Sequence, residues 1–328
     1  MPRSHFGHLK QDLGLIEEHL SESLFNPLQE FLTRPRHFFR SQLIPLGFEL
    51  GGGPQPTEAQ EDLMERAGQA IESVHAGSLI VDDVQDESET RRGQPCLHVE
   101  VGVPLALNAG HWLYFFAYRL IQDSEVAESV KTACLKEMTE ALLKAHQGQA
   151  LDLSVRMSQQ RVTEAPLICR QSLEWKAGAL LELGLVLGAR IAGCEGPRLN
   201  SLRMLGRELG VTLQMFNDLS NLEADEPEEK HLENLLLQRP SYVWWLVAEE
   251  FPDQWGPFKE AVMTLPQMDS LRFFLDLHPV IQKGRARALG HQQWTFQNFA
   301  TLGGDLTSPA FQKVEALAEK IAGSHTTN

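Results

Sequence analysis

Cysteines, basic residues and long apolar runs are all scarce in this chain of 328 residues, and each scarcity excludes a class of protein. The four cysteines, at 96, 134, 169 and 194, form no CxxC pair and no disulfide-rich module, so we expect free thiols in a reducing cytosol. Lys and Arg number 29 against 44 Asp and Glu, a net charge of −15. Such a surface repels nucleic acid and anionic membranes, and neither is expected as a partner.

Apolar runs long enough to cross a bilayer are also missing. The first twelve residues contain no apolar signal-peptide core. The longest candidate, residues 179–193, is interrupted by Glu182 and falls short of the roughly 18 residues that a span requires. The sequence therefore predicts a cytoplasmic protein with no transmembrane segment.

Helical periodicity is what the sequence has in abundance. Apolar residues recur at three- and four-residue spacing through 12–32, 58–82, 103–122, 125–156, 164–193 and 198–222, whereas strand-like alternation is scarce. Thr57 is the expected cap of one helix, with Glu58 and Glu61 in its first turn. Glycine and proline fall between these segments, and neither a repeat nor a linker is visible. We predict an all-α protein with a single domain.

An acidic cluster closes the predicted helix over residues 58–86. Asp82 and Asp86 would lie one turn apart on the same face, with Asp83 beside them. Their charges repel one another and the carboxyl end of the helix dipole. A magnesium ion, which prefers carboxylate, water and phosphate oxygens, would relieve both effects. On the acids alone, a solvated helix end is an equally good interpretation.

The flanking residues carry a resemblance to a known family. The stretch "HAGSLIVDDVQDESETRRGQPCLH", residues 75–98, resembles the first aspartate-rich motif of the trans-isoprenyl diphosphate synthases. The stretch "HQGQALDL", 146–153, resembles their Gly-Gln-x-x-Asp helix. The segment around Lys176 resembles their Lys-Thr-Gly-Ala segment with Ala177 in place of Thr, and 209–225 stands where the second aspartate-rich motif belongs. Within the family, the sequence is most similar to eukaryotic-type geranylgeranyl diphosphate synthases.

The resemblance implies a fold and a reaction. The expected fold is a helical bundle around a deep central cavity, formed by residues 1–328, with the motifs in 34–245 and further helices in 246–328, and usually found as a homodimer. The expected reaction joins an allylic diphosphate to isopentenyl diphosphate. The carbon–oxygen bond of the allylic substrate ionises, the isopentenyl double bond attacks the resulting cation, and a proton leaves. Metal ions and cationic side chains stabilise the departing pyrophosphate.

The resemblance also assigns roles to individual residues. About three magnesium ions would bind with the diphosphate, and their predicted ligands are Asp82, Asp86, Asp152, Asn217, Asp218 and Asn221, with Asp83 in support. Arg91 and Lys176 would face the allylic diphosphate and, with the three acids of the first motif, act in catalysis. The remaining substrate-binding residues are predicted to be His37, Arg40, His75, Arg92, Gln149, Gln214 and Arg239.

Two motifs depart from the family pattern. In the isopentenyl site, His37 replaces a lysine and Ser41 a proline, while Arg40 is kept; Arg34 and Arg36 are candidates for the missing charge. In the second metal motif, Asn217 and Asn221 replace aspartates. Together with Asp225 these asparagines resemble the Asn-Ser-Glu metal triad of class I terpene synthases. The later Gly-Lys motif appears only as Gln238-Arg239.

Product length in this family depends on bulky residues that close the cavity. Ala76 and Gly77, just before the acids, are small and leave the cavity open. A deeper floor is expected from Trp112, Tyr114, Phe115 and His146, which predicts a product of about C20. Two alternatives stay open because of the altered motifs: a class I terpene synthase or diphosphate lyase that uses no isopentenyl diphosphate, and a weakly active accessory subunit.

Overall fold

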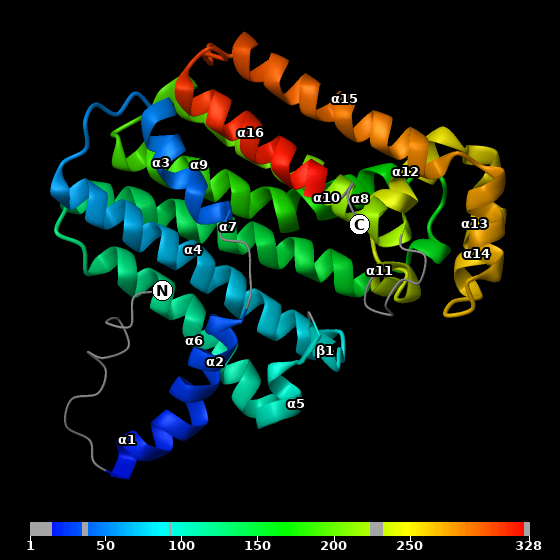
Figure 1. The fold of residues 1–328 in the computed structure, drawn as a ribbon, viewed down its shortest axis with the longest axis horizontal. Helices are drawn as coiled ribbons and strands as arrows, with labels where there is room; N and C mark the ends of the chain where they lie inside the picture. The colour runs from blue at the N-terminus through cyan, green and yellow to red at the C-terminus, as the bar shows by residue number, and fades with distance from the viewer. Residues whose placement is uncertain (1–14, 35–38, 92, 224–231, 325–328) are drawn as a thin grey trace. The chain divides into compact units, whose positions relative to one another are not determined.

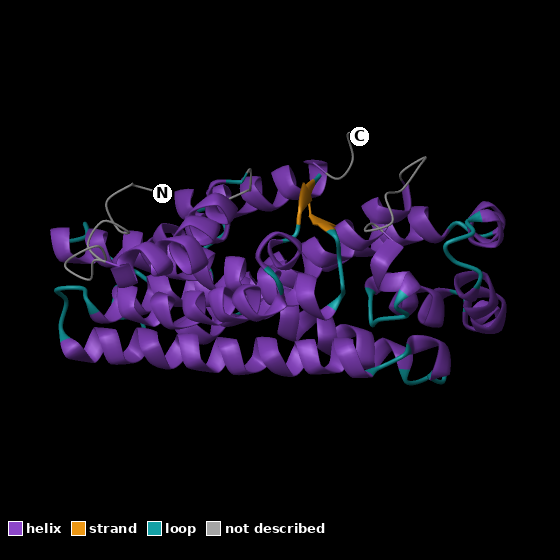
Figure 2. Ribbon diagram, turned by 90° about the horizontal axis from the view of Figure 1, so that it is seen from below, coloured by secondary structure: helices purple, strands orange, loops and turns teal. Residues whose placement is uncertain are grey.

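The computed structural model describes residues 15–34, 39–91, 93–223 and 232–324. The described residues are almost entirely helical, as predicted, and a two-residue hairpin of β1 (Thr90–Arg91) and β2 (Gln94–Pro95) is the strand pairing among them (Figure 2). None of the described helices combines the length and hydropathy that crossing a membrane requires. All four cysteines are buried free thiols.

The chain divides into two compact units, and each has its own core. The first unit comprises Met1–Gln42 and Thr57–Ala127, and the second comprises Leu43–Pro56 and Glu128–Asn328. The boundary at residue 42 falls within helix α3 (Phe39–Leu50). The predicted single domain of residues 1–328, with its motifs in 34–245 and further helices in 246–328, stays a prediction.

In the first unit, two long antiparallel helices pack against each other (Figure 1). Its elements are α1 (Leu15–Leu20), the π-helical turn η2 (Ser21–Phe25), α2 (Asn26–Thr33), α4 (Glu58–Gln85), the hairpin, α5 (Leu97–Val101) and α6 (Val103–Gln122). Thr57 caps α4, as predicted, and Gln60 completes the capping box by accepting a hydrogen bond from the Thr57 amide. The core lies between α4, α6 and the amino-terminal helices and includes Leu28, Ile80 and Leu113.

The second unit is a bundle built around α10. Its helices are α7 (Glu128–Ser154), η3 (Met157–Gln159), α8 (Ala165–Leu173), η4 (Glu174–Gly178), α9 (Ala179–Ile191), α10 (Gly196–Glu223), α11 (Glu233–Leu236), α12 (Tyr242–Glu250), η6 (Pro252–Gln254), α13 (Trp255–Met263), α14 (Asp269–Leu277), α15 (Val280–Thr301) and α16 (Pro309–Ser324). Helix α10 packs against α9 and α15, and α16 lies alongside it (Figure 1). The predicted helix over 164–193 is interrupted by η4, a π-helical turn that contains Lys176.

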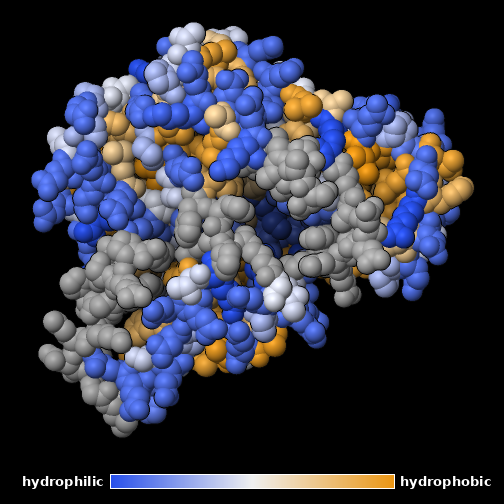
Figure 3. Space-filling model, viewed as in Figure 1, coloured by the Kyte–Doolittle hydropathy of each residue, from blue (hydrophilic) through white to orange (hydrophobic). Residues whose placement is uncertain are grey.

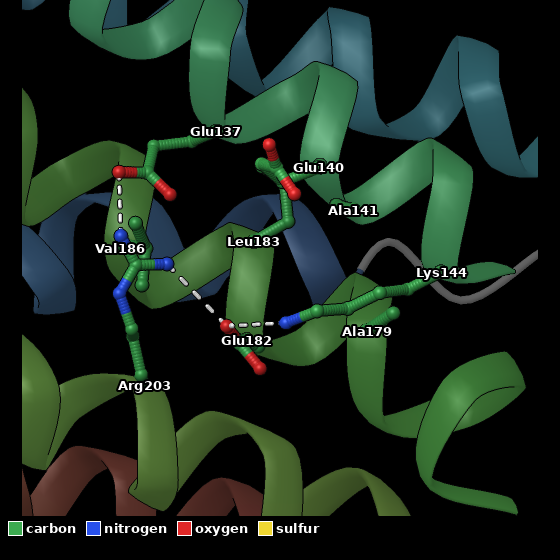
Figure 4. Close-up of a pocket in the computed structure, with 9 residues that line it drawn as sticks. All are labelled: Glu137, Glu140, Ala141, Lys144, Ala179, Glu182, Leu183, Val186 and Arg203. Carbon is green, nitrogen blue, oxygen red and sulfur yellow. Dashed lines mark hydrogen bonds and ion pairs between the residues drawn. The ribbon is translucent and has the colours of Figure 1, made fainter.

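Buried ion pairs connect α7, α9 and α10 of this unit (Figure 4). Glu137 accepts hydrogen bonds from Arg203, at 2.5 Å, and from Arg190, at 2.9 Å. Glu182 pairs with Lys144 at 3.5 Å and with Arg203 at 3.4 Å. Because each buried carboxylate meets at least two cations, its desolvation is compensated, and this network stabilises the bundle.

Hydrophilic residues cover much of the face shown in Figure 3, and apolar residues gather at the edge where α13 and α14 lie. Met263, Phe273 and Leu277 of these helices are more than half exposed. The sequence contains no motif that we interpret in this region, and the predicted site residues all lie elsewhere.

Candidate active site

The acids of the first motif lie at the carboxyl end of α4, in the predicted arrangement. The Asp86 amide donates to the Asp82 carbonyl at 2.9 Å, so the two residues lie one helical turn apart. Both are half-buried, whereas the Asp83 side chain is only 1% exposed. The helix ends here because Glu87 adopts the left-handed conformation with φ +54°. Two of the three acids are thus accessible at a helix end that disfavours anions.

Arg91, in β1, lies back against these acids because the chain reverses at Glu87 and Ser88. Its Nε donates to both carboxylate oxygens of Asp83, at 2.7 and 2.8 Å, and its Nη2 lies 3.4 Å from Asp82 Oδ2. The guanidinium therefore compensates the buried Asp83, and Asp83 in turn determines where the guanidinium lies. Among the described residues here, Arg91 contacts two of the three carboxylates, and the three acids and one arginine leave a negative surplus. Arg92 lies outside the described residues.

The residues predicted for the isopentenyl site are partly described. His37 and Arg36 lie outside the described residues. The start of α3 docks on α4, because the Ser41 amide donates to the buried Glu72 carboxylate at 3.2 Å. This contact places half-buried Arg40 near the turn of α4 that carries half-buried His75, three residues beyond Glu72.

Arg34, a candidate for the missing charge, pairs with a carboxylate of α5. Its Nη2 donates to both oxygens of Glu100, at 2.9 and 3.0 Å, and its Nη1 donates to the Pro95 carbonyl at 2.6 Å. The guanidinium is thus paired with a carboxylate and secures the hairpin and α5 to the end of α2. That Arg34 supplies the missing diphosphate charge stays a prediction.

Of the predicted chain-length residues, the structure brings Gly77 and Tyr114 together. A Cβ at Gly77 would lie 2.6 Å from the Gly110 carbonyl oxygen and 3.1 Å from Tyr114 Cε1, so α4 and α6 approach closely at this point. Burial, and secondarily the charge of Asp82, raises the pKa of Tyr114 to about 12. The Tyr114 ring therefore packs beside Gly77, which precedes Asp82 by one to two helical turns, and its role as a floor stays a prediction.

The other predicted floor residues are differently placed. Trp112 stacks on Phe116 and meets Phe25 edge-on, within the core of the first unit. Phe115 is 76% exposed and so is separated from the buried Gly77–Tyr114 contact. His146 belongs to the second unit, where it is exposed on α7 and contacts the Leu142 carbonyl.

In the second unit, a buried carboxylate meets two predicted substrate-binding cations. Asp152 Oδ2 lies 2.8 Å from Lys176 Nζ and 3.1 Å from Arg239 Nη1. The side chains of Asp152 and Arg239 are 4% and 5% exposed, and that of Lys176 is 33% exposed. We call these three residues the Asp152 cluster. These three side chains together carry one surplus positive charge, which suits an anion such as phosphate. The carboxyl group of buried Asp218 also interacts electrostatically with Asp152 and Lys176.

Gly148 and the π-helical turn explain how Lys176 reaches Asp152. A Cβ at Gly148 would lie 2.9 Å from Trp175 Cβ and 3.0 Å from the Lys176 amide nitrogen, so a larger residue would push η4 away from α7. Asp152 follows Gly148 by one helical turn and shares its face. The glycine of the predicted Gly-Gln-x-x-Asp motif thus permits the close approach that pairs the lysine with the aspartate. Gln149 is half-buried on the same helix.

The second metal motif lies on α10, where Asn217 and Asn221 are half-buried and one turn apart. Asp218, between them, is buried. Its oxygens accept hydrogen bonds from the Tyr242 amide and from Gln214 Nε2, both at 2.7 Å. Burial raises the pKa of Asp218 to about 6 against the lowering effect of these bonds. Asp218 thus anchors the start of α12, and its role as a metal ligand stays a prediction. Asp225 lies outside the described residues.

Within the described ranges, no group of three or more His, Cys, Asp or Glu side chains is gathered closely enough to hold a metal alone. Asp82 and Asp86 nevertheless offer the hard oxygen donors of which magnesium takes one or two, the remainder coming from water and phosphate. The donor set at the end of α4 therefore fits magnesium bound together with a diphosphate.

Comparison with known proteins identifies the family. The polyprenyl synthetase family model matches residues 21–266, three quarters of the sequence. The chain belongs to the polyprenyl synthetase family. A short chain isoprenyl diphosphate synthase of Methanocaldococcus jannaschii is 33% identical over 163 residues, which is 49% of this chain and 47% of that protein. The chain thus spans about half the length of this curated relative.

Solved structures of similar proteins confirm the polyprenyl synthetase fold. A geranylgeranyl pyrophosphate synthetase from Geoglobus acetivorans aligns with a TM-score of 0.76 and 20% identity, covering 94% of this chain and 97% of that one. A geranylgeranyl pyrophosphate synthase from Corynebacterium glutamicum, complexed with isoprenyl diphosphate and magnesium, aligns at 0.72 and 19% identity, covering 93% and 91%. The predicted helical fold class is confirmed.

Some site residues of this polyprenyl synthetase family member escaped the sequence analysis. Glu72 holds the segment that carries Arg40, and Glu100 pairs with Arg34 at the hairpin that carries Arg91. Neither glutamate is part of a recognisable sequence motif. Gln238, which we noted only as a departure from a glycine, contacts η3. The sequence signal for Gln238 is that a glutamine stands where the family has glycine.

Proposed function

We propose that this protein is a magnesium-dependent prenyltransferase that condenses an allylic diphosphate with isopentenyl diphosphate to a product of about C20. The observation that carries the proposal is the end of α4, where Asp82 and Asp86 lie one turn apart beside an arginine that Asp83 holds. The family assignment and the names of the relatives support it.

Each of the two charged clusters has a separate task in this proposal. Asp82 and Asp86 would hold magnesium, and Arg91 would contribute positive charge for the allylic diphosphate. Magnesium, when bound, supplies charge that stabilises the pyrophosphate as it departs. Lys176 and Arg239 bind phosphate oxygens, and Asp152 orients these two cationic side chains. Because Asp152 carries a single negative charge, it neutralises only one of their two positive charges.

The reaction requires no reagent beyond the two diphosphate substrates. The allylic carbon–oxygen bond breaks and its electron pair leaves with pyrophosphate. The isopentenyl double bond then forms the new carbon–carbon bond, and one proton is lost to restore a double bond. Arginine and lysine donors near the diphosphate favour the first step because they stabilise the anion that it produces.

One assay distinguishes the proposal from its competitors. Purified protein is incubated with magnesium, labelled isopentenyl diphosphate and an allylic diphosphate. Label in a longer diphosphate supports the proposal. The half-buried Asn217 and Asn221 favour one competitor, a terpene synthase or lyase, which would release a hydrocarbon or alcohol from the allylic substrate alone. Turnover that requires a second chain would indicate an accessory subunit.

Three further parts of the proposal concern assembly, metal content and location. A homodimer is supported by apolar residues exposed on α6, with Leu105 39% and Phe115 76% exposed; a monomeric mass in light scattering would contradict it. About three magnesium ions are expected per bound diphosphate, and titration calorimetry counts them. The buried free thiols support a reducing cytoplasm, which fractionation of cells tests.

A further inference from the structure

Gln238 adopts a backbone conformation that few residues other than glycine accept. Its φ is +54°, and the one other described non-glycine residue with positive φ is Glu87, directly after Asp86. Gln238 closes α11 in a Schellman turn: its amide donates to Leu235 at 2.9 Å, and the Arg239 amide donates to Asn234 at 2.7 Å. Glycine usually occupies this position, because a Cβ is disfavoured there. Such outliers among ordered residues gather at functional sites.

Two contacts to η3 hold Gln238 in this conformation. The Met157 amide donates to the Gln238 carbonyl at 2.8 Å. The Ser158 hydroxyl donates to Gln238 Oε1 in a short hydrogen bond. The first contact needs only backbone and would survive in a glycine variant. The bond from Ser158 needs the glutamine side chain, which a glycine lacks.

These contacts join the two segments on which the Asp152–Arg239 ion pair depends. Asp152 is in the last turn of α7, five residues before Met157, and Arg239 directly follows Gln238. The Arg239 guanidinium is buried, so a small shift of its backbone changes its distance from Asp152. We infer that Gln238 is a positioning residue for Arg239, which it holds on Asp152 beside Lys176 so that both cations bind the substrate's diphosphate. This inference rests on the proposed function.

The test measures binding of inorganic pyrophosphate, with magnesium present, by calorimetry. Q238G keeps the turn and removes the side-chain link, so the folded state is preserved while Arg239 gains freedom. Pyrophosphate Kd is expected to rise about 3- to 10-fold, as for one lost hydrogen bond. In turnover, the expected signature is a higher KM for the diphosphate substrate with a smaller change in kcat. S158A should have the same effect, and S158T, which keeps a hydroxyl, should restore the wild-type Kd.

A double-mutant cycle identifies the residue through which Gln238 acts. In an R239Q background, Q238G should cause no further loss of pyrophosphate affinity, because the residue that it positions is gone. R239M, which keeps an unbranched chain without the charge, serves in place of R239Q where the latter fails to fold. Additive losses at positions 238 and 239, or an unchanged Kd in Q238G, would overturn the inference.

Failure of the proposed function has a different signature. In that case the wild-type protein binds no pyrophosphate and joins no substrates. The coupling of positions 238 and 239 is then measured by urea denaturation of the same four proteins. Non-additive losses support the positioning role, and additive losses exclude it.

Discussion

The end of α4 and the Asp152 cluster each bury an aspartate against an arginine, yet they carry opposite surplus charge. At the end of α4, Asp82 and Asp86 remain accessible after Arg91 has paired with Asp83. In the Asp152 cluster, one carboxylate meets two cations. The ratio of acids to bases thus decides the ligand, because a negative surplus attracts metal cations and a positive one attracts phosphate.

Removing one accessible acid is the strongest way to break this comparison. D82N should lower kcat by about 100- to 1,000-fold, because the end of α4 loses a ligand for the ion that stabilises the leaving group. Steady-state kinetics with magnesium measures it. The control is D62N on the same helix, where Asp62 forms a half-buried pair with Arg66 and activity should be retained. Equal activity of D82N and wild type would refute the metal role.

The Glu137 network, formed by Glu137, Arg190 and Arg203, extends the comparison of the two charged clusters. There a buried acid meets two arginines, but no ligand is proposed. Burial raises the pKa of Glu137, but bonds from Arg203 and Arg190 outweigh this effect and hold it below 4.5. E137Q should lower the free energy of unfolding by on the order of 3 kcal/mol at pH 7.

The pH dependence of this loss follows from the sign of the pKa shift. Because the folded pKa is depressed, the stabilisation is complete above about pH 4.5 and is lost as pH falls through the folded value. The difference between wild type and E137Q should therefore shrink in acid, as measured by urea denaturation at several pH values. E140Q, an exposed neighbour, is the control and should lose little stability at any pH. A difference that is constant with pH would contradict the pairing.

Substitutions of two lysines, each paired with a buried acid, distinguish an effect on phosphate binding from an effect on stability. K176Q should raise KM for the allylic diphosphate roughly tenfold, because the Asp152 cluster loses its surplus charge. K144Q, which removes one of the partners of Glu182, should leave KM unchanged. Initial-rate kinetics measures the KM of each variant. Similar KM values would show that the Asp152 cluster has no greater part in substrate binding than the network around Glu182.

The smallest expected effect is a change of product rather than of rate. Y114A removes the ring that packs on Gly77 below Asp82, and the product should lengthen beyond C20. Chromatography of the dephosphorylated products measures chain length. F115A, at the exposed neighbouring position, should leave product length unchanged. A longer product from F115A would restore Phe115 to the predicted floor, and an unchanged product from Y114A would dismiss Tyr114.

Much of the local structure could be predicted because it depends on neighbours in the chain. The cap at Thr57, the start of α4 and the one-turn spacing of Asp82 and Asp86 all follow from periodicity and short-range hydrogen bonds. The π-helical turn at Lys176 could not be predicted, since it depends on how closely Gly148 lets two segments approach. The same holds for Arg34, whose partner Glu100 is 66 residues away.

The sequence by itself determined the helical class, the family resemblance and which residue types the site contains. Only the tertiary structure decided how their charges are distributed. Arg91 pairs with Asp83 because the chain reverses after α4, Asp218 anchors Tyr242, and Gln238 is held to η3 across 80 residues of sequence. The physical reason is that a charged side chain interacts with whatever the fold brings within a few ångströms, and sequence spacing specifies that only within one helix.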